Sequence, residues 1–198
     1  DPLPSGDGQK LSARIQSNGK AYRSYNFTFV EPWLGGKKRN SLSLGYYNTK
    51  YANAYDAYGR FCKVCGDTSY VKTIGISVSL GKQLKWPDDY FSLIYTFNVQ
   101  KYYLKNYDRI FAGIRNGPST NISLTLTLLR NSAGPNPIFP TSGSNFLLSG
   151  QFTLPYSSLG ISTTGGNGES PYRLPEFHKW RFNGEWFIPI GTAKGADK

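Results

Sequence analysis

Long stretches of this chain alternate apolar and polar residues, and this period constrains the fold more than any other feature. From Ile74 to Leu80 the even positions are Ile, Ile, Val and Leu, and the odd positions between them are Gly and Ser. Phe91–Val99 and Ile122–Leu128 carry the same period. Successive side chains of a β-strand point to opposite faces, so each stretch predicts a strand with one apolar and one polar face. The sequence therefore predicts an all-β, antiparallel fold.

Eight segments carry this period, and turn-forming residues separate them. The predicted strands are Lys10–Ser17, Tyr22–Val30, Ser41–Thr49, Tyr70–Leu84, Tyr90–Leu104, Asn121–Asn131, Ser144–Pro155 and Glu176–Pro189. The hairpin signal Asn18-Gly19 joins the first two. Short or moderate turns follow the second, fourth and sixth strands, and long loops follow the third, fifth and seventh. Long loops on one side only are typical of outer-membrane barrels.

The composition is compatible with strands that cross a bilayer. Gly (22), Pro (12) and aromatic residues (16%) are plentiful, and the mean hydropathy is −0.45. No apolar run approaches the roughly 20 residues of a membrane helix, whereas roughly 9–11 tilted strand residues are enough to cross a bilayer. We therefore expect a transmembrane β-barrel segment. The alternatives are a soluble or surface-attached β-sandwich binding module, in which the aromatic residues fill a core, and a porin-like channel.

The charge balance is strongly basic, with 23 basic and 12 acidic residues and a formal net charge of +11. Such a charge often indicates nucleic-acid binding. Here, however, the basic residues are scattered singly through strands and turns, and only Lys37-Lys38-Arg39 forms a run. We expect a basic lumen or contact with anionic lipid, and no nucleic-acid partner.

No motif indicates an enzyme, a metal site or a cofactor. Cys62 and Cys65 have the spacing of a zinc or redox motif, but zinc needs two further ligands and His178 is the only histidine. We expect a local disulfide between these cysteines in an oxidising extracellular loop, with a pair of unlinked thiols as the alternative. Asp88-Asp89 falls in a tight turn, where Asp is common for backbone reasons.

A tyrosine-rich loop after the third predicted strand is the candidate for contact with another protein. Tyr is favoured at interfaces because it offers a large area and a hydroxyl at low entropic cost. Alternatively, these aromatic residues hold the loop together over the barrel mouth. The candidate contact residues are Tyr51, Tyr55, Tyr58, Phe61 and Tyr70.

Three segments, two turns and one strand, carry motifs that are similar to those of a known family. They are Phe29–Gly36, Arg130–Ser132 followed by Asn136–Ser144, and Glu176–Phe182 leading to Phe187–Pro189. They resemble, in the same order, motifs of the BamA family of bacterial surface antigens, in a version similar to that of Bacteroidota. The turn residues that we expect to fix backbone geometry on the periplasmic side are Pro32, Trp33, Gly35, Gly36, Pro137, Phe139, Pro140 and Gly143.

This resemblance implies a non-enzymatic factor of the Gram-negative outer membrane that folds and inserts other β-barrel proteins. The implied partners are outer-membrane lipid, client outer-membrane proteins, accessory assembly lipoproteins, and the remaining barrel with its periplasmic POTRA repeats. The family's barrel has sixteen strands and carries a Val-Arg-Gly-Phe-type motif in its C-terminal half. Neither this motif nor POTRA repeats occur here. We therefore expect residues 1–198 to form a partial barrel, from about the third to the tenth strand, without the lateral gate.

Overall fold

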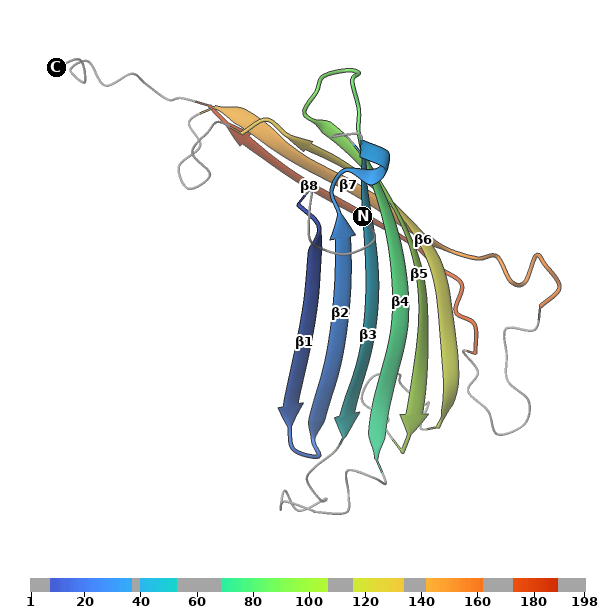
Figure 1. Cartoon of the computed structure of the whole chain (residues 1–198). Helices are drawn as coiled ribbons and strands as arrows, with labels where there is room; N and C mark the ends of the chain where they lie inside the picture. The colour runs from blue at the N-terminus through green and yellow to red at the C-terminus, as the bar shows by residue number, and fades with distance from the viewer. Residues whose placement is uncertain are drawn as a thin grey trace.

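Eight strands form one antiparallel sheet in the computed structural model, which describes residues 8–36, 40–52, 69–106, 116–133, 142–161 and 173–188. The strands are β1 (Lys10–Asn18), β2 (Tyr22–Glu31), β3 (Asn40–Ala52), β4 (Tyr70–Gln83), β5 (Phe91–Lys105), β6 (Gly117–Asn131), β7 (Gly143–Thr153) and β8 (His178–Phe187), with a short 3-10 helix η1 (Leu34–Gly36) after β2. Each strand pairs with the next one in the chain, and Figure 1 shows them as a single curved layer. None of the helical residues described here forms a segment long and apolar enough to span a membrane.

All eight predicted strands are confirmed, with boundaries that differ by a few residues. The largest difference is in β6, which begins at Gly117 instead of Asn121. Pro118 made this segment resemble a loop, because Pro is rare inside strands. It is nevertheless paired, opposite Tyr103 of β5. The prediction that the loop after β5 extends to Thr120 is therefore wrong.

The register sorts the side chains into two faces that extend across the whole sheet. Cross-strand partners share a face, and along the middle of the strands apolar residues face apolar residues. We call this the outer face, and its apolar residues the apolar belt. The belt comprises Leu11, Ala13, Ile15, Tyr25, Phe27, Phe29, Leu42, Leu44, Tyr46, Ile74, Ile76, Val78, Leu80, Phe91, Leu93, Tyr95, Phe97, Val99, Ile122, Leu124, Leu126, Leu128, Phe146, Leu148, Phe152, Trp180, Phe182 and Trp186.

No second layer covers the apolar belt in the described part of the chain. Ile76 is 56% exposed and Phe97 is 47% exposed, whereas among the described residues the buried apolar side chains are Val71, Leu104 and Tyr156. Because all described strands belong to one sheet, the sandwich alternative, which needs a second sheet, is wrong. An apolar surface of this extent needs cover from a partner or from lipid.

The opposite, inner face is mostly polar, and its side chains form hydrogen bonds between neighbouring strands. The hydroxyls of Ser24 on β2 and Thr49 on β3 lie 3.0 Å apart. Gln151 Nε2 on β7 donates to Ser123 Oγ on β6 at 3.1 Å. Such a face suits a water-filled barrel interior.

Gly75 on the inner face makes room for a neighbouring aromatic ring. It lies opposite Tyr47, and a Cβ atom at position 75 would collide with the Tyr47 ring. We expect Gly75→Ala to lower the free energy of unfolding by about 1–3 kcal/mol, because the ring must be displaced. The matched control is Gly81→Ala on the same strand, whose new Cβ would first meet the rotatable hydroxyl of Ser41. Denaturant unfolding in detergent measures both variants, and equal losses would contradict this explanation.

Candidate functional site

The connections between consecutive strands alternate between the two ends of the sheet. The β2–β3, β4–β5 and β6–β7 connections lie at one end, which we call the turn end, and η1 marks it near the top of Figure 1. The β3–β4, β5–β6 and β7–β8 connections lie at the other end, the loop end, together with the β1–β2 hairpin. The two longest connections, β3–β4 and β7–β8, both lie at the loop end, as predicted. The β5–β6 connection is only as long as the β6–β7 connection at the turn end, because β6 begins at Gly117.

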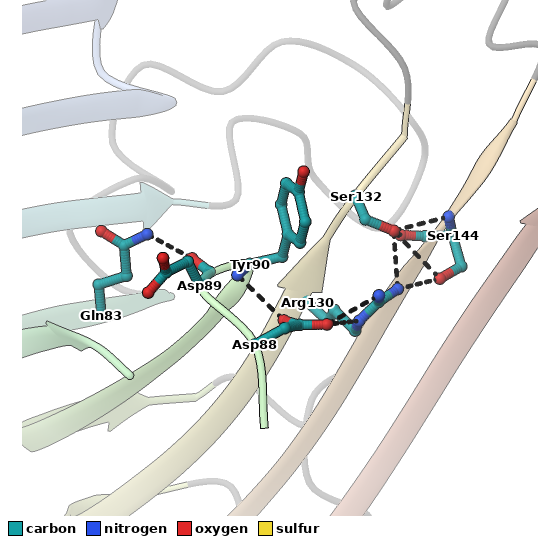
Figure 2. Close-up of polar contacts among 7 residues, drawn as sticks. All are labelled: Gln83, Asp88, Asp89, Tyr90, Arg130, Ser132 and Ser144. Carbon is teal, nitrogen blue, oxygen red and sulfur yellow. Dashed lines mark hydrogen bonds and ion pairs between the residues drawn. The ribbon is translucent and has the colours of Figure 1, made fainter. Parts of the chain in front are cut away.

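At the turn end, Arg130 links two strand connections that are distant in the sequence, as Figure 2 shows. Its Nε and Nη2 donate to Oδ2 of Asp88 at 3.1 and 2.9 Å. Its Nη1 donates to Ser132 Oγ at 2.7 Å and also to Ser144 Oγ. Asp88 Oδ1 in turn accepts the backbone N–H of Tyr90 at 3.0 Å. The guanidinium therefore joins the β4–β5 turn to the start of β7.

The end of β6 and the start of β7 are held close together beside this guanidinium. The backbone N–H of Ser132 donates to the carbonyl of Ser144 at 3.0 Å, and the Ser144 N–H donates to Ser132 Oγ at 3.1 Å. Gly143 has φ 102°, and a Cβ atom there would collide with the Ser132 carbonyl. Only glycine fits this backbone and this close approach. The other motif residues of this connection, Pro137, Phe139 and Pro140, lie outside the described residues.

The β2–β3 connection also depends on glycine. Gly35 and Gly36 have φ values of 69° and 72°, which is the left-handed region. The Trp33 N–H donates to Oε1 of Glu31 at 3.1 Å, and the Gly36 N–H donates to the Trp33 carbonyl at 2.9 Å. Pro32, Trp33 and both glycines therefore lie together at the turn end. Their role in fixing the periplasmic backbone remains a prediction.

The predicted partner-contact loop is only partly visible in the described residues. Tyr51 belongs to β3 and lies on the inner face, where its ring centroid is 4.6 Å from that of Tyr22. Tyr70 begins β4 and lies on the outer face, with Nζ of Lys50 4.5 Å from its ring centroid. The structure therefore does not bring these two residues together. Tyr55, Tyr58, Phe61 and the predicted disulfide residues Cys62 and Cys65 lie outside the described residues.

At the loop end, Glu176 anchors the segment that leads into β8. Its Oε2 accepts the Ser157 hydroxyl at 2.7 Å, and its Oε1 accepts the Ser157 backbone N–H. These hydrogen bonds hold the pKa of the Glu176 carboxyl below its ordinary value. The carboxylate thereby ties the end of the β7–β8 connection to its beginning. Within the described ranges, no group of three or more His, Cys, Asp or Glu residues could hold a metal ion.

These features together define a class of protein. A curved antiparallel sheet with an apolar outer face, a polar inner face and long loops at one end is part of the wall of an outer-membrane β-barrel. Residues 5–196 match the family model of the Omp85 superfamily domain. The chain belongs to the Omp85 superfamily, and its barrel segment lies in the outer membrane.

A solved structure has the same fold over most of this chain. It is the crystal structure of BamA from Haemophilus ducreyi lacking POTRA domains 1-3, with 21% sequence identity and a TM-score of 0.51. The match covers 75% of this chain but only 29% of that chain, so the eight strands correspond to part of a BamA barrel. The search of curated proteins gives no significant match. The resemblance seen in the sequence is thereby confirmed for the family and the fold, and the family generally comprises non-enzymatic assembly factors.

The Arg130 cluster can be tested by a double-mutant cycle. We expect Arg130→Gln to lower the free energy of unfolding by about 1–3 kcal/mol, because it removes charge-assisted bonds from partly exposed groups. The double variant Arg130→Gln, Asp88→Asn should lose less free energy of unfolding than the two single variants lose in sum. Asp89→Asn is the control, since this neighbour contributes its backbone carbonyl to Gln83. Strictly additive losses in denaturant unfolding would show that Asp88 and Arg130 do not stabilise each other.

Proposed function

We propose that this chain is part of the wall of a larger barrel that folds and inserts client β-barrel proteins into the outer membrane. Residues 1–198 would supply about eight strands of a sixteen-stranded barrel, as one partial barrel domain. The proposed partners are outer-membrane lipid, client proteins, accessory assembly lipoproteins, and the remaining barrel with its POTRA repeats. No covalent chemistry is required. Family membership supports this proposal, and the shape of the apolar belt is the observation that carries it.

The apolar belt narrows from the middle of the sheet towards β1. On β4 it runs over Ile74–Leu80, with lysine at the next outer-face position on both sides. On β2 it runs only over Tyr25–Phe29, between Arg23 and Glu31. At about 3.3 Å per residue, the belt is about 20 Å long on β4 and about 13 Å long on β2.

A belt this short affects the surrounding lipid. The apolar band of outer-membrane barrels is about 25 Å tall. Because the strands are tilted, the height of the belt along the membrane normal is smaller than its length along each strand. Lipid beside β1 to β3 must therefore thin to match the belt, at a cost of fractions of a kcal/mol per ångström. A thinner bilayer lowers the barrier for a client hairpin whose polar turn has to cross it. This is the physical reason to propose insertion activity for this wall.

The edges of the described sheet supply the second element of the proposal. β1 and β8 are its terminal strands, and each presents backbone N–H and C=O groups on one side. We propose that these groups pair with the remaining strands of the barrel. An incompletely sealed seam elsewhere in that barrel would offer the same kind of groups to an incoming client strand, by β-augmentation.

Extending the belt near β1 tests this proposal. Ser17→Leu combined with Asn48→Leu adds apolar residues on the outer face of β1 and β3, where the belt is short. The matched control, Thr120→Leu, adds an apolar residue on the outer face of β6, where the belt is already longer. Because the bilayer then thins less, we expect the double variant to slow the folding of a client barrel about tenfold.

The measurement is the rate at which a client barrel acquires its heat-modifiable gel mobility in vesicles that contain the protein. Vesicles without the protein give the baseline rate, and the wild type must exceed it. A double variant that is as fast as the wild type, or a control variant that is equally slow, would contradict the role of the narrow belt.

A further inference from the structure

A row of basic side chains crosses the outer face at the loop end of the sheet. The register places Arg23 of β2 opposite Lys50 of β3, and Lys50 opposite Lys72 of β4. On β5, Lys101 lies opposite Ile74, one outer-face position nearer the belt. We call Arg23, Lys50, Lys72 and Lys101 the basic rim.

The basic rim concentrates positive charge at one end of the outer face. The residues described at the loop end of β2 to β6 include no Asp or Glu. Like charges directly opposite each other on one face of a sheet are destabilising. Aromatic rings support two of the ammonium groups: Nζ of Lys50 lies 4.5 Å from the Tyr70 ring centroid, and Nζ of Lys101 lies 5.1 Å from that of Tyr103.

The outer face has a cavity between these cations. Its volume is about 320 Å³, and it is lined by Arg23, Tyr25, Asn48, Lys50, Tyr70 and Lys72. Arginine can donate two parallel hydrogen bonds to one phosphate group, and lysine adds mobile point charges. The lining therefore combines three cations with an amide and phenolic hydroxyls, which are donors for phosphate and sugar oxygens.

The depth of the basic rim in the membrane identifies the source of the anion. The next outer-face residues towards the middle of the sheet, Tyr25 and Ile74, already belong to the apolar belt. Lys and Arg at this boundary place their apolar stems in the belt and their charges at headgroup level. In outer-membrane barrels the long loops lie on the extracellular side, so the rim faces the headgroups of the outer leaflet.

We propose that the basic rim binds the phosphate groups of a phosphorylated lipid headgroup in the outer leaflet. The cavity opens on the lipid-facing side of the sheet and not on its inner face, which favours a lipid over a free phosphate. Bound lipid would place a fixed anionic molecule beside β2 to β4, where the apolar belt becomes shorter. This inference goes beyond the proposed function, because it does not depend on client insertion.

The test is a titration of the full chain, in zwitterionic detergent micelles, with the diphosphorylated glycolipid lipid A, followed by native mass spectrometry. We expect Lys50→Gln to weaken binding about fivefold, which corresponds to about 1 kcal/mol for one cation near an anionic headgroup. Arg23→Gln, Lys50→Gln and Lys72→Gln together should weaken it about 100-fold by the same reasoning. The matched control is Lys82→Gln, an exposed outer-face lysine at the turn end, which should bind as the wild type does.

Three outcomes would overturn the proposal. One is unchanged binding in both the single and the triple variant. Another is an equal loss in Lys82→Gln, which would show general charge attraction and not a site. The third is complete displacement of lipid A by millimolar inorganic pyrophosphate, which would identify a site for free phosphate. Heat-modifiable gel mobility checks that each variant is folded, and the single variant carries the test should the triple variant fail to fold.

Discussion

In the hydrocarbon layer of a membrane, a backbone N–H or C=O group has no water to bond, so its partner must come from the protein. The uninterrupted antiparallel ladder from β1 to β8 supplies these partners. The same ladder fixes the register, and the register decides which face each side chain takes. A slip of one residue in any strand would move its apolar residues to the inner face. The apolar belt, the polar inner face and the basic rim all depend on this one set of bonds.

Where the ladder ends, side chains take over part of its role. At the turn end, Arg130 holds Asp88 and the two serines that frame the β6–β7 connection. At the loop end, Glu176 binds both the hydroxyl and the backbone of Ser157. Charged groups are thus placed at both ends of the sheet, where water and headgroups solvate them. Because the chain belongs to the Omp85 superfamily, this sheet is part of the wall of an outer-membrane barrel.

The strands could be predicted because a period of two leaves little alternative, whereas features set by tertiary pairing could not. Asp88 lies in a turn, as the sequence predicts, but its ion pair with Arg130 could not be predicted, because Arg130 lies 42 positions away and its place depends on how β5 and β6 align. The sequence pattern places Tyr51 in a loop, but β3 continues to Ala52, and the alternation of side chains along the strand then places Tyr51 on the inner face. Gly117-Pro118 is typical of a loop, so the sequence does not predict that β6 begins at Gly117. The sequence does not reveal the basic rim, because its members are single residues in four strands.

The central claim, that the outer face contacts lipid and the inner face contacts water, can be tested with nitroxide labels. One pair of labels at Phe97 and Leu124 samples the outer face, and another at Thr96 and Thr125 samples the inner face. Both use a background with Cys62 and Cys65 replaced by serine. In reconstituted vesicles, the account predicts that oxygen dissolved in lipid relaxes the outer labels and that a water-soluble nickel chelate relaxes the inner ones. Equal relaxation of both pairs by the nickel chelate would contradict it.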